Sequence, residues 1–266
     1  MARPLIIFLL FFYSNTLFSG NGDSLTLIIP TEQIAFFTVD YHGNIYVVKK
    51  SNEVSCYTKK GELKFSYRSQ HRNRIRSMDA SNPLKLLLFY EGVPEAVFLD
   101  NYLTETNSLK FMELGFQEVS AICMSSDNKL WLYDALENSI CKIDPDNRKV
   151  VSRNRLTLQG IDPISEISDF KEYRNNLYLN NTGKEVVEFD FLGNKRKRFS
   201  IPISGNVSFT GDSLIFLRND SVIFYNFVDY SIYKKPIDTK VHSENIKKIV
   251  LSNGKIYFLK NNGIYY

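Results

Sequence analysis

Hydrophobic and polar residues alternate over short stretches along most of the chain, and turns rich in Gly, Asn, Asp or Ser separate these stretches. The segment VDYHGNIYVV (39–48) is a clear example, with a hydrophobic strand end, a His-Gly-Asn turn and a second alternating run. A period of two is typical of β-strands, and a turn of this composition between two such runs indicates a hairpin. We therefore predict a hairpin here, with Gly43 and Asn44 in its turn.

Similar turn-and-strand units recur at 79–92, 125–134, 172–181, 209–219 and 251–261. The first aliphatic residues of the six strands are separated by 41, 44, 47, 37 and 42 residues, and they are Ile45, Leu86, Leu130, Leu177, Leu214 and Ile256. A period of ~40–50 residues is typical of the four-stranded blades of a propeller. The repeat predicts six blades.

The interior of each unit fits four strands, which we name A to D from the inside outwards. The segment most similar to a helix, 94–111, contains the β-formers Thr104 and Thr106, and it aligns with strands C and D of the second unit. The last unit stops after its third strand, whereas SLTLIIP (24–30) is a lone strand. Because a propeller must remove its open edges, we predict an all-β, six-bladed β-propeller whose last blade is completed by the N-terminal strand.

The segments TVDYHGNIYVVKKSNEVSCYTKKGELKFSY (38–67) and MSSDNKLWLYDALENSICKID (124–144) resemble blades of NHL-type and TolB-type propellers, and of the wider six-bladed group that contains the gluconolactonases. The resemblance covers residues 24–266. It implies the propeller fold, with ligands bound around the central channel on the face formed by the D-to-A and B-to-C loops. It selects no activity, since this architecture hosts hydrolases, lyases, receptors and scaffolds.

The N-terminal segment has one Arg, an apolar run at 5–13 and then small and polar residues. This layout is typical of a secretory signal peptide, and the run is shorter than the ~20 residues that span a bilayer. We predict a signal peptide at 1–19 and a single propeller domain at 20–266 without a transmembrane span. An uncleaved anchor is the alternative. The expected location is the periplasm or the outer membrane.

The amino-acid composition excludes few classes of function. The chain has 266 residues, of which 44% are hydrophobic, and its net charge is +4, which does not indicate nucleic-acid binding. Cys56, Cys123 and Cys141 lie in strand-like apolar patterns, where buried thiols are usual. Cys123 and Cys141 fall on strands A and C of one blade, about 9.6 Å apart, which exceeds the ~7 Å limit for a disulfide.

The three histidines do not form a recognisable site. His42 lies on an A-to-B turn, on the face opposite the expected binding face, so we expect it to be a turn residue. His71 and His242 lie on D-to-A connections of different blades, and the sequence has no zinc motif, nucleophile elbow or P-loop. The basic segment QHRNRIR (70–76) is a better candidate, and His71, Arg72, Arg74 and Arg76 are predicted binding residues.

Two further segments are candidates for a binding site. GIDPISEISDF (160–170) is rich in carboxylates, and we add Asp162 and Glu166 to the predicted binding residues. GNKRKRFS (193–200) lies at a C-to-D turn and outer strand, where Lys and Arg protect an exposed edge from pairing. The alternative for this segment is a patch for anionic lipid, polysaccharide or an acidic partner.

We therefore predict a non-catalytic binding or scaffold protein that binds a ligand or protein partner through loops on one face. We expect no cofactor, a protein or cell-envelope partner, no nucleic acid, and a monomer outside its complex. The alternative is a metal-dependent lactonase, sugar hydrolase or lyase, with calcium or zinc in the central channel. Its predicted ligands are Glu32, Glu118, Glu166 and Asn206. A sensor ectodomain held by an uncleaved anchor is a third possibility.

Overall fold

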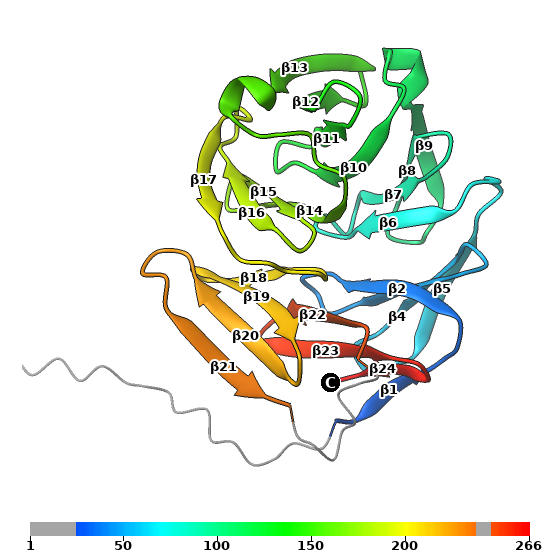
Figure 1. Cartoon of the computed structure of the whole chain (residues 1–266). Coiled ribbons are helices and arrows are strands. Elements are labelled where there is room, and N and C mark those ends of the chain that lie inside the picture. The colour runs from blue at the N-terminus through cyan, green and yellow to red at the C-terminus, as the bar shows by residue number, and fades with distance from the viewer. Residues whose placement is uncertain (1–24, 238–245) are drawn as a thin grey trace, which may run out of the picture.

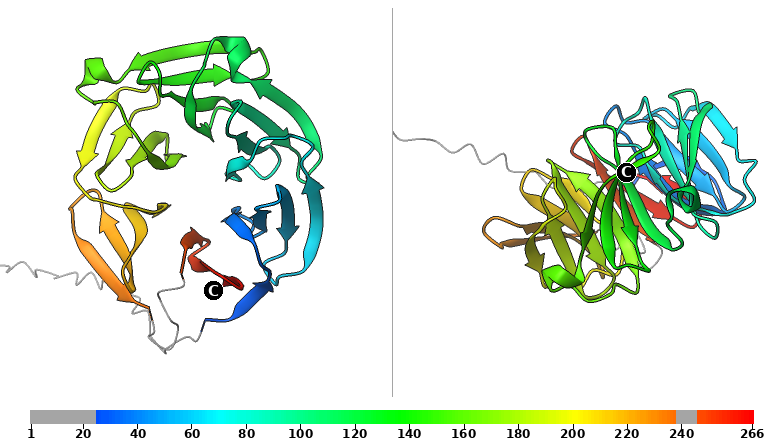
Figure 2. Two further views of the ribbon diagram at one scale, coloured as in Figure 1. Left: turned by 45° about the vertical axis from the view of Figure 1, so that its right-hand side comes forward. Right: turned by 90° about the horizontal axis from the view of Figure 1, so that it is seen from above.

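The computed structural model describes residues 25–237 and 246–266, and their regular structure is almost entirely β-strand. These strands form six sheets of four antiparallel strands each, arranged in a ring as the blades of a propeller (Figures 1 and 2). The predicted fold class is confirmed. The predicted signal peptide and His242 lie outside the described residues. Within the described residues, no helix is long and apolar enough to cross a membrane.

Blades 1 to 3 follow one another along the chain, and each is built from its innermost strand outwards. Their strands are β2 (Ile34–Val39), β3 (Ile45–Lys49), β4 (Glu53–Tyr57) and β5 (Leu63–Arg68); β6 (Ile75–Asp79), β7 (Leu86–Tyr90), β8 (Glu95–Leu99) and β9 (Glu105–Lys110); and β10 (Val119–Met124), β11 (Leu130–Asp134), β12 (Ser139–Asp144) and β13 (Lys149–Arg155). Two short 3-10 helices follow the outer strands of blades 2 and 3, namely η1 (Phe111–Leu114) and η2 (Thr157–Gln159).

Blades 4 and 5 repeat this order, whereas blade 6 combines the two ends of the chain. Their strands are β14 (Ile167–Tyr173), β15 (Asn176–Asn181), β16 (Glu185–Phe189) and β17 (Lys195–Phe199); β18 (Ser208–Thr210), β19 (Ser213–Arg218), β20 (Ser221–Asn226) and β21 (Ile232–Pro236); and β22 (Lys248–Ser252), β23 (Lys255–Lys260), β24 (Gly263–Tyr265) and β1 (Leu27–Pro30). The strands predicted at 94–111 are therefore confirmed as β8 and β9.

The ring is closed by the N-terminal strand, as predicted. β1 pairs antiparallel with β24 and becomes the outer strand of blade 6, with Leu27 opposite Tyr265 and Pro30 opposite Gly263. Gly263 has a φ of +150°, and a Cβ atom there would lie 2.2 Å from the carbonyl oxygen of Ile29. The close approach of β1 therefore requires glycine at this position.

The hydrophobic core is divided among the six blade-to-blade interfaces of the described chain. In each of the six buried clusters, side chains of one blade pack against those of the next. A blade therefore has neighbours on both faces, and its second strand is buried on both sides, as in β7 and β11. This explains the continuous apolar runs in these strands. The strand B aromatics Trp131, Tyr133 and Phe216 are at most 2% exposed and pack between blades.

The three cysteines are free thiols within this core, as the strand assignment predicted. β11 separates Cys123 on β10 from Cys141 on β12. Burial raises the pKa of all three thiols.

Neighbouring blades also touch at their outer strands. The turn between β16 and β17 packs on β13 of the preceding blade, where the Asn154 side-chain amide donates a 2.6 Å hydrogen bond to the Leu192 carbonyl oxygen. Gly193 in this turn has a φ of +85°, and a Cβ atom there would lie 2.4 Å from the Asn154 amide nitrogen. Glycine thus allows the two blades to meet at this point.

Candidate functional site

The inner strands of the blades surround a central cavity of about 820 Å³. Its walls come from β2, β6, β10, β14, β18 and β22, together with the loops that lead into them. This volume lies within the range of small-molecule sites in proteins, ~300–1,000 Å³.

Basic side chains gather where the D-to-A loops enter this cavity, an end that we call the D-to-A mouth. Lys50 directly follows β3, whereas Arg74 and Arg76 flank the first residue of β6, and Lys247 and Lys248 lie at the start of β22. These five residues come from blades 6, 1 and 2, which are consecutive in the ring. They therefore form an arc of positive charge on one side of the mouth.

The bases of the mouth have few partners. Nε of Arg74 lies 2.9 Å from Oε1 of Glu91, and Nη1 of Arg76 lies 4.0 Å from the other oxygen of the same carboxylate. Within the described part of the chain, the side chains of Lys50 and Lys247 have no hydrogen bond or ion pair. The two arginines therefore share the carboxylate of Glu91, and the two lysines have no such partner among the described residues.

Lys248 lies deeper and is half-buried in the cavity wall. Its ammonium group is 5.4 Å from the ring centre of Phe36. Burial, and next the positive charge of Lys171, lower the pKa of Lys248 to about 8, against the opposite effect of Asp169. Lys171 itself lies 3.5 Å from Asp169 and donates a 3.2 Å hydrogen bond to the Val207 carbonyl oxygen. The charge of Lys248 is thus poorly compensated.

Two acidic side chains of the cavity wall, Asp79 and Glu172, lie towards its opposite end, where the A-to-B turns begin. Asp79 ends β6, and its carboxylate accepts hydrogen bonds from the backbone N–H of Met124 at 2.9 Å and of Ser81 at 2.8 Å. Since Met124 belongs to blade 3, this hydrogen bond joins blade 2 to blade 3. Asp169 lies nearer the mouth, on the third residue of β14, and it also joins two blades, because it accepts a hydrogen bond from the Val207 N–H of blade 5 at 2.9 Å.

Glu172 makes the densest of these blade-to-blade contacts. It accepts hydrogen bonds from the Ser125 hydroxyl and the Trp131 indole N–H, both at 2.6 Å, and from the Ser126 N–H at 2.9 Å. Burial alone would raise the pKa of Glu172, but these donors lower it below its usual value. The carboxylate is therefore held ionised and is used to join blade 4 to blade 3.

The four binding residues predicted in segment 70–76 do not all face the cavity. Arg74 and Arg76 line the cavity, whereas His71 and Arg72 do not. The His71 ring lies 3.1 Å from Glu95, 3.5 Å from Glu105 and 4.8 Å from the Tyr90 ring centre. These partners belong to blade 2, and they hold the loop to that blade away from the channel.

The carboxylates of the metal hypothesis do not come together. Glu32, Glu118 and Glu166 are exposed and lie outside the cavity wall, as does Asp162, which was predicted as a binding residue. Asn206 lines the cavity, and its side-chain amide donates to the Ile249 carbonyl oxygen at 2.5 Å. In residues 25–237 and 246–266, no group of three or more His, Cys, Asp or Glu side chains is placed to hold a metal ion.

Sequence analysis missed Lys50, Lys171, Lys247 and Lys248. Their only signal is position, since Lys247 and Lys248 stand at the start of an inner strand and Lys171 lies within another. His42 was placed correctly: its N–H donates to the Asp40 carboxylate in the A-to-B turn, at 2.8 Å.

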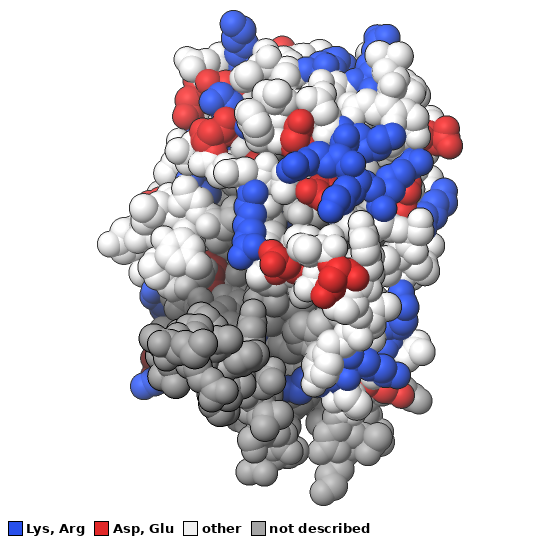
Figure 3. Space-filling model, turned by 90° about the vertical axis from the view of Figure 1, so that its left-hand side faces the viewer, with Lys and Arg blue, Asp and Glu red and all other residues white. Residues whose placement is uncertain are grey.

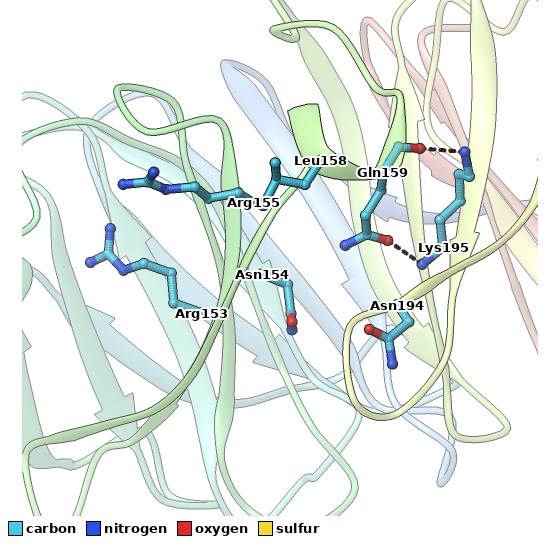
Figure 4. A pocket seen from close by; sticks show the side chains of 7 residues that line it. All are labelled: Arg153, Asn154, Arg155, Leu158, Gln159, Asn194 and Lys195. Carbon is cyan, nitrogen blue, oxygen red and sulfur yellow. Dashed lines mark hydrogen bonds between the residues drawn. The ribbon is translucent and has the colours of Figure 1, made fainter.

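A second hollow lies on the outside of the ring, with a volume of about 590 Å³ (Figure 4). We call it the blade 3–4 groove, and it is lined by Arg153, Asn154, Arg155, Leu158, Gln159, Asn194 and Lys195. The groove includes Asn194 and Lys195, at the start of the basic segment 193–200. Residues 195–199 of this segment form the outer strand β17. The edge-strand position predicted for this segment is confirmed.

No family model matches the sequence, and no curated protein is significantly similar to it. Solved structures with a similar fold include a catalytically inactive virginiamycin B lyase from Staphylococcus aureus, with 16% identity, 88% of this chain and 80% of that chain covered, and a TM-score of 0.63. A streptogramin B lyase has 14% identity, coverages of 91% and 86%, and a TM-score of 0.64. BamB from Moraxella catarrhalis has 10% identity, coverages of 86% and 80%, and a TM-score of 0.51.

At these identities the similarity concerns the fold and not the activity. The chain has the six-bladed β-propeller fold.

Proposed function

We propose that the protein is an exported, non-catalytic binding protein that takes up an anionic ligand through the D-to-A mouth of its central cavity. The observation that carries this proposal is the separation of charge along the cavity. The bases at the mouth have few partners, whereas Asp79 and Glu172 at the other end accept hydrogen bonds from a neighbouring blade, as Asp169 does nearer the mouth.

Physical chemistry favours an anion at this end. A cavity with low-dielectric walls and charge of one sign attracts oppositely charged ligands. A partly desolvated cation without a close anionic partner raises the free energy of the folded state, and a bound carboxylate or phosphate would offset this cost at the half-buried Lys248. Arg74 and Arg76 add guanidinium groups, which bind such anions with good geometry.

The use of the carboxylates supports binding rather than acid–base chemistry. A general base or a metal ligand needs oxygen lone pairs directed at the substrate or the ion. The oxygens of Glu172 are occupied by Ser125, Ser126 and Trp131, and their role is to hold blades together.

The N-terminal sequence supports the proposed location. The signal-peptide pattern at 1–19 supports export to the periplasm or the outer membrane. A cell-envelope component or a protein there is the expected partner, and propellers suit this role because rigid blades hold variable loops at fixed angles.

The test is to purify the protein from its native host under mild conditions, release bound small molecules and identify them by mass spectrometry. We expect an anionic compound in near-stoichiometric amount, and its loss from the variant Arg74→Ala/Lys248→Met. The matched control is Lys64→Ala/Lys234→Ala, which removes two exposed bases from the outer strands β5 and β21.

A neutral ligand, or an anion retained equally by both variants, would overturn the proposal. Stoichiometric calcium or zinc together with conversion of the released compound would instead establish the alternative, a metal-dependent hydrolase or lyase.

A further inference from the structure

We propose that the blade 3–4 groove docks an acidic, extended segment of a partner protein. This site is distinct from the central cavity, because its lining residues come from the outer strands and from η2. It therefore goes beyond the proposed uptake of an anionic ligand.

The groove is a built feature of the contact between two blades. Gln159 on η2 makes two contacts with Lys195. Its side-chain oxygen accepts a hydrogen bond from the Lys195 backbone N–H, and its backbone carbonyl oxygen accepts one from the Lys195 ammonium group. Its side-chain amide also donates to the Gly193 carbonyl oxygen at 3.2 Å. Figure 4 shows Lys195 on one side of the hollow and the Arg153 and Arg155 side chains extending on the other. Basic side chains thus lie on both sides of it, and Arg153 and Arg155 also pair with Asp134 at 3.0 Å and with Glu137 at 3.1 Å.

The positive charge continues beyond the groove along β17. Its first four residues are Lys195, Arg196, Lys197 and Arg198, all exposed. Arg198 pairs with Glu185 at 3.2 Å, and Arg196 donates to the neutral side chain of Asn176 at 3.0 Å. Figure 3 faces this side of the ring and shows Lys and Arg side chains gathered over part of the surface. No other described outer strand carries four consecutive bases.

Exposed apolar side chains stand beside the bases. Leu158 on η2 is 85% exposed, and Phe191 and Leu192 at the tip of the β16–β17 turn are 60% and 55% exposed. Basic and apolar groups therefore alternate over the same area, which suits a partner with acidic residues and an aliphatic or aromatic anchor.

The shape and spacing favour a polypeptide as the occupant. An extended chain places side chains of one face about 7 Å apart, which matches the spacing of same-face bases on β17. A bilayer is a flat surface and does not enter a hollow between two blades. Lys and Arg on an edge strand discourage pairing with ordinary strands, and the same charges favour an acidic one.

The test measures binding of a short fluorescein-labelled peptide of Glu and Ser with one central Leu, by fluorescence anisotropy on the full protein. The groove variant is Arg155→Glu/Arg196→Glu/Lys197→Glu, and the control is Lys64→Glu/Lys110→Glu/Lys234→Glu, with the same charge change on outer strands of blades 1, 2 and 5. We expect the groove variant to lose at least about tenfold in affinity and the control less than about threefold. Leu158→Ser should weaken binding by a smaller factor, and circular dichroism verifies that each variant is folded.

Three results would overturn the inference: no binding of the peptide, equal losses in both triple variants, or groove-dependent binding to vesicles containing phosphatidylglycerol but not to the peptide. The cavity variant Arg74→Ala/Lys248→Met should bind the peptide as the wild type does, so failure at one site is distinguishable from failure at the other.

Discussion

The two ends of the central cavity differ in how they use charge. At the A-to-B end, Asp79 and Glu172 accept hydrogen bonds from the neighbouring blade. At the D-to-A mouth, Lys50 and Lys247 have no such contacts among the described residues, and Lys248 is half-buried near a second cation, Lys171. A charged group with all its partners in place maintains the architecture, whereas buried charge without partners is costly and indicates a function. We therefore expect changes at the A-to-B end to affect stability and changes at the mouth to affect binding.

The largest effect on stability should follow from Glu172→Leu. The variant leaves the Trp131 indole N–H and the Ser126 N–H without their acceptor, and we expect a loss of about 3 kcal/mol in the free energy of unfolding. Urea denaturation measures it. Glu118→Leu, an exposed site at the opposite end, is the control and should cost less than about 0.5 kcal/mol. Similar losses in both variants would contradict the structural role of Glu172.

Lys248→Met should increase the free energy of unfolding, whereas Glu172→Leu lowers it. The pKa of Lys248 is about 8 in the folded protein and near 10.5 in the unfolded chain, so folding releases protons between these values. The wild type therefore gains stability as the pH rises from 8 to 10.5, and it carries the full penalty below pH 8. We expect the variant to be more stable by roughly 2 kcal/mol at pH 7 and equal to the wild type above pH 10.5. A stability difference independent of pH would contradict this account.

Asp79→Ala should cost about 1.5 kcal/mol, because the Met124 N–H loses its acceptor between blades 2 and 3. Hydrogen exchange at the Met124 amide should accelerate more than exchange at amides of blade 5. Unchanged protection of this amide would show that the Asp79 contact does not hold the blades together.

The smallest change in stability is expected for Arg74→Ala/Arg76→Ala, within about 0.5 kcal/mol, because both side chains are exposed and share one carboxylate. The same variant should lose affinity for the anionic ligand, as measured by calorimetry. His71→Ala is the contrasting change, since its contacts with Glu95 and Tyr90 lie away from the cavity. It should lower stability and leave anion affinity unchanged. The reverse pattern would place the binding site on the His71 side of the loop.

The fold was predictable from the sequence because a repeat near 42 residues and a lone N-terminal strand determine the blades and their closure. The residues that line the channel were only partly predictable. Arg74 was identified from its loop, but Lys248 was not, because a lysine at a strand start has no sequence signature. The sequence also does not show that His71 lies beside Glu95 and Glu105 and outside the channel wall, since neither carboxylate is near it in sequence.

The most direct test of the charge separation is anomalous scattering from crystals soaked in selenate at neutral pH. We predict bound anions at the D-to-A mouth, within reach of Lys248 and Arg74, with lower occupancy above pH 9 as Lys248 loses its proton. Anions beside Asp79 and Glu172, or a mouth that binds none, would contradict the account.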